Sequence, residues 1–131
     1  MDWTLEVVVV PVNDVDRAIT FYRDKVGFSL DFDTRTAHER FAQLTPPGSG
    51  CSIQLKDPSP MSPGSVRGLL LVVADAYRAR QRLLDGGVVA GEIEVVDERD
   101  GGTLFGFADP DSNEWVVQQL KARADKPLLR R

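Results

Sequence analysis

Few side chains in this sequence have the type and spacing that catalysis needs. The chain contains a single histidine, His38, and a single cysteine, Cys51, and no motif connects the two. A Cys/His pair or a Ser/His/Asp triad is therefore not indicated. His38 falls in a polar stretch expected to form a hairpin. Cys51 begins an expected strand, where a cysteine usually serves as a small buried hydrophobic residue.

Carboxylates are plentiful, but most occupy positions where an acidic side chain stabilises the local backbone. Asp14 and Asp75 each precede an expected helix and are typical N-caps. Asp109 and Asp111 flank an expected tight turn, in which aspartate accepts hydrogen bonds from nearby backbone groups. These four residues are accordingly predicted to be structural rather than catalytic.

The charge of the chain argues against a nucleic acid or an anionic membrane as a partner. The net charge is −4, and the residues up to Leu120 hold 11 basic and 19 acidic side chains, a net charge of −8. Residues 121–131 form a basic C-terminal tail. No apolar run approaches the ~20 residues that span a bilayer. With one cysteine and no secretory signal, we expect a cytoplasmic protein.

The elements that position the side chains occur twice along the chain. An apolar strand leads through Asp14 into a helix, and 61 residues later another strand leads through Asp75 into a second helix. Self-similarity of this kind is typical of a duplicated supersecondary unit. At this offset the matched pairs are Asp14/Asp75, Arg17/Arg78, Ala18/Ala79 and Asp24/Asp85.

The order of the elements predicts an α+β fold of two tandem βαβββ modules within a single domain, residues 1–120. Module 1 covers about residues 4–56, a proline-rich loop covers 57–65, and module 2 covers about 66–120. The first helix is expected to end before Gly27. The expected strands are 5–12, 28–32, 40–45 and 51–55 in module 1, and 66–73, 88–96, 103–108 and 114–119 in module 2.

Three segments carry a resemblance to a known family: Val9 to Ala18 with the following Phe21-Tyr22 and Gly27-Phe28, then Gly68 to Asp75, then Phe107 to Asn113. In this order they resemble the vicinal oxygen chelate superfamily, which includes glyoxalase I, extradiol dioxygenases, fosfomycin-modifying enzymes and bleomycin-binding resistance proteins. The resemblance spans about residues 5–119. It implies a curved, mostly antiparallel sheet around a central cup with helices on the convex side, but it implies no particular activity.

In the metal-dependent members of this superfamily, His, Gln or Glu ligands on the first and last strand of each module point into the cup. Carried over to this chain, the four positions are Val7, Gly68, Val116 and either Ile53 or Gln54, depending on the register of one turn. Valine and glycine side chains have no lone pair to donate, and one glutamine does not hold a divalent cation. The alignment therefore implies no metal, and we expect no cofactor.

Strand alternation, combined with this alignment, indicates which side chains line the cup. If Val7 and Val116 point inward, so do Val9, Glu114 and Gln118. An apolar concavity with a few polar groups is typical of a pocket for an organic ligand, although the same side chains could instead fill a core. The predicted cup residues are Val7, Val9, Phe41, Gln43, Ile53, Gln54, Phe105, Val116 and Gln118.

The sequence favours a metal-free protein that binds a small organic molecule, for example an aromatic one, in an apolar cup. A lyase, isomerase or dioxygenase-type enzyme is the alternative. Such an enzyme would be metal-free, with Glu114, Gln118 or Gln54 as catalytic groups, or it would hold a metal through ligands at unexpected positions. A protein-interaction module with a filled core stays open as well. Relatives of this length usually dimerise, and edge strands with unpaired backbone groups tend to pair with another chain. We therefore expect a homodimer.

Overall fold

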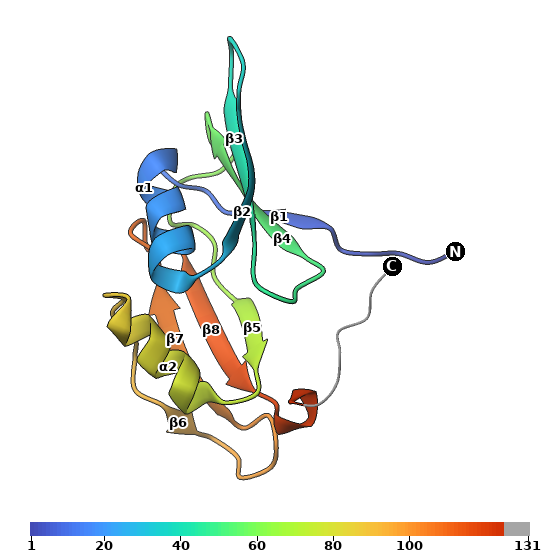
Figure 1. Ribbon diagram of the computed structural model, residues 1–131, viewed down its shortest axis with the longest axis vertical. Coiled ribbons are helices and arrows are strands. Elements are labelled where there is room, and N and C mark those ends of the chain that lie inside the picture. Colours follow the sequence, from blue (N-terminus) through green and yellow to red (C-terminus); the bar gives the residue numbers. More distant parts are fainter. Residues whose placement is uncertain (125–131) are drawn as a thin grey trace.

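The chain folds into two similar halves, each a four-stranded sheet with a helix packed on it (Figure 1). The structure, a computed structural model, describes residues 1–124; residues 125–131, most of the expected basic tail, lie outside the described residues. The first half contains β1 (Val7–Val9), α1 (Val15–Ile19), η1 (Thr20–Val26), β2 (Ser29–Arg35), β3 (Arg40–Thr45) and β4 (Ser52–Asp57). The second contains β5 (Leu69–Val73), α2 (Ala76–Asp85), β6 (Glu94–Val95), β7 (Thr103–Ala108) and β8 (Glu114–Gln119), followed by η2 (Lys121–Arg123).

This arrangement confirms the predicted α+β fold of two βαβββ units. The strand orders are β1-β4-β3-β2 and β5-β8-β7-β6, so the two halves have the same topology. We expected one eight-stranded sheet, whereas the strands hydrogen-bond in two separate sheets. The first strand of each half runs parallel to the last, and the remaining pairings are antiparallel. Among residues 1–124 no helix is both long enough and apolar enough to cross a membrane.

The ends of the helices follow the capping signals in the sequence. The Asp14 carboxylate accepts a hydrogen bond from the Arg17 backbone N–H, and the Asp75 carboxylate accepts from the N–H groups of Tyr77 and Arg78. After one turn α1 continues as a π-helical segment, η1. Gly27 ends it with φ +99°, a left-handed conformation that glycine adopts without steric cost.

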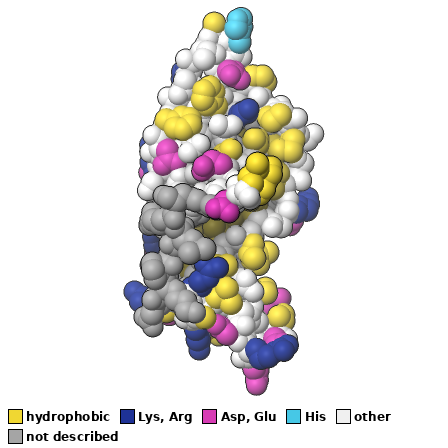
Figure 2. All heavy atoms as spheres, turned by 90° about the vertical axis from the view of Figure 1, so that its right-hand side faces the viewer, with side chains coloured by type: hydrophobic (Ala, Val, Ile, Leu, Met, Phe, Trp, Pro, Cys, Tyr) yellow, Lys and Arg dark blue, Asp and Glu magenta, His cyan; other side chains and the backbone are white. Residues whose placement is uncertain are grey.

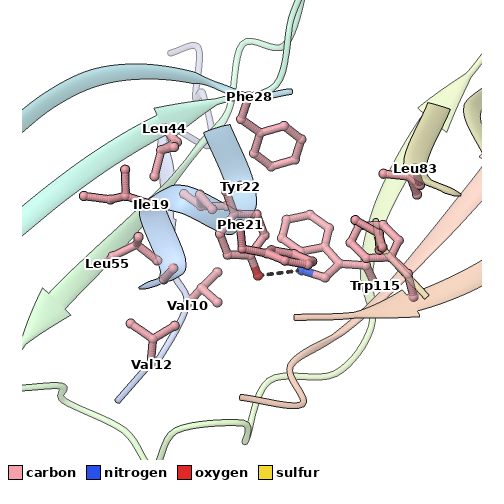
Figure 3. Packing of buried hydrophobic residues seen from close by; sticks show 14 of the residues in the cluster. Val10, Val12, Ile19, Phe21, Tyr22, Phe28, Leu44, Leu55, Leu83 and Trp115 are labelled. Atoms are coloured by element: carbon pink, nitrogen blue, oxygen red, sulfur yellow. Dashed lines mark hydrogen bonds between the residues drawn. The ribbon is translucent and has the colours of Figure 1, made fainter. Parts of the chain in front are cut away.

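The core lies where η1 packs between the two sheets (Figure 3). Tyr22 of η1 is fully buried, and its hydroxyl donates to Asp109 Oδ2 at 2.7 Å and accepts from Trp115 Nε1 at 2.9 Å. The Trp115 ring stacks on Phe107 with ring centroids 5.9 Å apart. Because Trp115 and Phe107 belong to the second sheet and Tyr22 to the first module, the two halves share one hydrophobic core.

The turn between β7 and β8 is part of this core. Asp109 accepts hydrogen bonds from the backbone N–H groups of Asp111 and Asn113 through Oδ1. The Asn113 amide is fully buried and donates to the Pro11 carbonyl oxygen at 2.8 Å, which ties the second module to the end of the first strand. The side-chain oxygen and nitrogen atoms of Asp109 and Asn113 all have hydrogen-bond partners, and such satisfied buried groups specify one packing arrangement. In the same turn Asp111 Oδ2 is buried without a partner among the described residues.

Burial alternates along the strands, so each sheet has one face on the core and one turned away from it. Leu44 of β3 and Leu55 of β4 lie in the core. Their chain neighbours Gln43 and Gln54, which pair with each other across the two strands, lie on the opposite face. In the second sheet Trp115 and Val117 face the core, and the other face carries Gly68, Leu70, Val72, Leu104, Gly106, Glu114, Val116 and Gln118. We call the face of each sheet that is turned away from the core its cup face. The cup face of the first sheet carries Val7, Val9, Phe32, Phe41, Gln43, Thr45, Ser52 and Gln54.

Candidate functional site: two cup faces

Most of the residues expected in the cup lie on the cup faces, but two do not. Ile53 and Phe105 lie in the hydrophobic core, with 4% and 1% of their surfaces exposed. The sequence left Ile53 and Gln54 as alternatives for the cup position in the first module, and in the structure it is Gln54 that lies on the cup face. Phe105 is paired with Val117, a core residue, and this pairing directs its ring to the helix side of the sheet.

The cup face of the second sheet is hollowed because glycines line it. Gly106 lies directly opposite Val116 in the β7–β8 register, and Gly68 and Gly91 line the same hollow, whose volume is about 440 Å³. A Cβ atom added at Gly68 would meet no atom within 4 Å, so this part of the surface is open space. Glu114 lies at its rim. The hollow is apolar apart from backbone groups and this one carboxylate.

The cup face of the first sheet combines aromatic rings with amide groups. Phe32 and Phe41 meet edge to face, with ring centroids 6.0 Å apart. Gln43 and Gln54 lie side by side on neighbouring strands. Figure 2 looks onto the side of the molecule opposite α1 and shows hydrophobic side chains interspersed with acidic ones over the first module. This face offers flat apolar surface together with hydrogen-bonding groups.

The three candidate catalytic residues are not brought together. Glu114 forms an ion pair with Arg67, and its side chain is 53% exposed. Gln118 lies four residues further along β8, about 13 Å away for an extended strand, and donates to the Gly101 carbonyl oxygen at 2.9 Å. Gln54 belongs to the other sheet. Within one chain, residues 1–124 therefore place no poised acid–base pair among these three.

Two smaller apolar hollows lie between the modules. One, of about 180 Å³, is lined by Phe28, Leu71 and Leu83, with Arg82 among its lining residues. The other, of about 270 Å³, lies between the edges of the two sheets and includes Cys51 and Leu69 in its wall. The first is lined mainly by side chains that belong to or border the core, so we treat it as a packing gap between the modules. The second also reaches Gly68, Leu70 and Ser52 of the cup faces.

A family model corresponding to the Glyoxalase/Bleomycin resistance protein/Dioxygenase superfamily matches residues 4–117, nearly the whole described chain. The chain belongs to this superfamily. The match agrees with the duplicated βαβββ topology and with the resemblance found in the sequence.

Several superfamily proteins are similar to this chain. A glyoxalase/bleomycin resistance protein from Streptomyces sp. CB03234 is 36% identical, with a TM-score of 0.77 over 88% of this chain and 100% of the other. TnmS3, an antibiotic binding protein from the same organism, is 35% identical, with a TM-score of 0.80 over 91% of this chain and 97% of the other. An uncharacterised protein of Shewanella frigidimarina is 32% identical over 124 residues, covering 86% of this chain and 90% of the relative.

The residues at the superfamily's metal-ligand positions do not fit a metal in this member. In the alignment made from the sequence these positions are Val7, Gln54, Gly68 and Val116, which all lie on the cup faces, and only the glutamine offers a donor atom. Over residues 1–124, no three His, Cys, Asp or Glu side chains gather as a metal site would require. His38 lies in the exposed turn between β2 and β3. A divalent cation needs several oxygen, nitrogen or sulfur ligands, which these four positions do not supply.

Sequence reasoning missed the residues that shape the cup faces. Gly106 interrupts the apolar strand 103–108, and a glycine inside a strand often marks the close approach of a ligand or backbone. That signal was visible in the sequence. Leu70 and Val72 were not identified because the run Leu69–Val73 is apolar on both faces, so alternation gives no indication of which face is exposed.

Proposed function

We propose that this chain is a metal-free binding protein of the glyoxalase/bleomycin resistance superfamily that holds a small organic molecule with a flat aromatic part. The proposal is supported by the hollow lined by Gly68, Gly106 and Val116. Of these, Gly68 and Val116 align with metal-ligand positions of the superfamily, and neither side chain has a donor atom. An apolar hollow with few polar groups suits an organic ligand better than an ion. The similarity to TnmS3, an antibiotic binding protein, supports sequestration of an antibiotic-like molecule.

We further propose that the binding site is completed by a second copy of the chain. The two cup faces of one chain both turn away from the core that its modules share, so each is half of a cup. They carry exposed apolar side chains, including Leu70 at 55%, Phe32 at 38% and Val72 at 37% exposure. Pairing the first cup face of one copy with the second cup face of another covers this surface in a symmetric dimer.

The test is a thermal-shift screen of the purified protein against flat aromatic natural products and against Mn²⁺, Ni²⁺ and Zn²⁺. A ligand present at about 100 times its Kd adds about 2.7 kcal/mol to the free energy of unfolding. We expect stabilisation by at least one aromatic compound. Stabilisation by a metal alone would show that the ligand positions have been assigned wrongly.

Filling the hollow provides the specific control. Gly106→Val places a β-branched side chain in the space opposite Val116, and the strand backbone accepts it because the nearest atom to an added Cβ, the Trp115 carbonyl oxygen, is 3.4 Å away. We expect this variant to fold and to bind the aromatic compound at least about tenfold more weakly, since a filled hollow removes the contact area. Gly50→Val, at a position where an added Cβ meets nothing within 4 Å, should bind normally.

A further inference from the structure

An irregularity in β2 alters which of its side chains lie on the cup face. The register of β2 against β3 shifts between Leu30, which pairs with Leu44, and Phe32, which pairs with Gln43. Asp31 is therefore an extra residue, and together with Phe32 it lies opposite Gln43. This is a β-bulge, an arrangement that redirects side chains near functional sites.

The bulge places Asp31 and Phe32 on the same side of the sheet. In a regular strand Phe32 would follow Phe28 and Leu30 into the core, and Asp31 would point the opposite way. Instead Phe32 is 38% exposed and meets the ring of Phe41 on the cup face. The Asp31 carboxylate also turns to this face, where Oδ2 accepts a hydrogen bond from Gln43 Nε2 at 3.1 Å. An anionic group and an aromatic pair are thus neighbours.

The Asp31 carboxylate is held in position through one of its two oxygens. Its Oδ2 also accepts from Thr45 Oγ1 at 2.5 Å, and Thr45 Oγ1 lies 2.6 Å from Ser52 Oγ on the next strand. Among residues 1–124 no donor bonds to Oδ1. A preorganised carboxylate with a free oxygen binds a cationic donor without the cost of ordering itself first.

We propose, on the basis of the binding function proposed above, that Asp31 selects aromatic ligands that carry a protonated amine. Its free oxygen accepts a hydrogen bond from an N–H group of the cation, while Phe32 and Phe41 contact the ligand ring. The net charge of −8 up to Leu120 adds a field that attracts cations and repels anionic aromatics. The ligand class is therefore a cationic, flat aromatic amine.

The test compares 9-aminoacridine, a cation at pH 7.5, with acridine, its neutral counterpart of the same ring shape, by fluorescence titration. We expect the wild-type protein to bind the cation at least about tenfold more tightly, as a hydrogen bond between charged groups implies. Asp31→Asn should abolish that preference and leave the affinity for acridine within about twofold of the wild-type value.

Asp33→Asn is the matched control, because it removes the same charge from the same strand. The Asp33 carboxylate binds Arg40 on the opposite side of the sheet, away from the cup face. It should keep the preference for the cation. If Asp33→Asn also loses the preference, the preference for the cation results from net charge, and the role of Asp31 is overturned.

The remaining outcomes separate this inference from the function on which it rests. If the wild-type protein binds both compounds equally well, aromatic binding stands and selection by Asp31 is overturned. If Asp31→Asn retains the preference, the inference is likewise overturned. If neither compound binds, the aromatic-binding function fails and the inference fails with it.

Discussion

At the scale of single residues, hydrogen-bonded polar side chains are found both in the core and on the first cup face. The hydroxyl of Tyr22 connects Asp109 and Trp115, and burial together with the neighbouring Asp109 carboxylate raises the pKa of Tyr22. The phenol therefore stays protonated and keeps donating to Asp109. The Asp109–Asn113 turn that looks like a carboxylate motif in the sequence is used to join the two modules. Other polar groups lie on the first cup face, where Gln43 donates to Asp31.

Removing the Tyr22 hydroxyl should affect stability and not binding. In Tyr22→Phe, Trp115 Nε1 loses its acceptor in the buried core, while Asp109 Oδ2 keeps the hydrogen bond from Asn113. A buried donor left unsatisfied costs about 1–3 kcal/mol, measurable by urea denaturation. Tyr77→Phe, with a side chain that is 58% exposed, should leave the free energy of unfolding unchanged. An equal loss in both variants would contradict this account.

At the scale of elements, one arginine joins the β2–β3 hairpin to α1. Arg40 forms two hydrogen bonds to Asp33 and contacts Asp16 on α1 at 2.7 Å. The hydrogen bonds from Arg40 hold the pKa of both carboxyls below their usual range. Because these pKa values are lower in the folded than in the unfolded state, the stabilisation is present above about pH 4 and is lost as the pH falls below that value.

The contribution of Arg40 should therefore depend on pH. We expect Arg40→Gln to lower the thermal unfolding midpoint by a few degrees at pH 7, since partly buried ion pairs contribute modestly. At about pH 3 and below the difference from the wild-type protein should narrow, because the partners become protonated. Arg99→Gln, which breaks a pair with Asp97 in an exposed turn, should show little effect at either pH. A difference for Arg40→Gln that persists at low pH would exclude the ion pairs as its cause.

At the scale of the whole molecule, the position of the core is the reason why we propose a second copy of the chain at the site. Tyr22 and Trp115 pack the modules together through their helix sides, so the cup faces are left uncovered. One edge strand of each sheet, β1 in the first and β5 in the second, is likewise unpaired on its outer side among residues 1–124. In the proposed dimer, the partner would cover the cup faces and complete the cup.

A charge on the second cup face should disrupt the dimer. Leu70→Lys replaces an exposed apolar side chain of β5 with a cation that would be desolvated on association. We expect light scattering after size-exclusion chromatography to show a wild-type dimer and a largely monomeric variant with weakened aromatic binding. Leu84→Lys, on an exposed position of α2, should remain dimeric. A wild-type monomer that still binds aromatic compounds would limit the site to one chain.

The sequence alone determined the features that depend on local signals. The duplicated modules, the N-caps Asp14 and Asp75 and the glycine end of the first helix all follow from residue types at fixed spacing. Strands β3, β7 and β8 also occupy their predicted residues, because alternation and flanking turns define them within the segment itself. The lack of donor atoms in Val7, Gly68 and Val116, three of the four residues aligned with the superfamily's metal ligands, is likewise a property of the sequence.

Only the tertiary structure decided which side chains reach the cup. Strand 5–12 shortens to Val7–Val9 and strand 88–96 to Glu94–Val95, because a strand extends only as far as its neighbour pairs with it. The choice of Gln54 over Ile53, and the exposure of Phe32 beside Asp31, depend on register and on one bulge. A shift of one residue moves a side chain to the other face of a sheet, and pairing between distant segments sets that register.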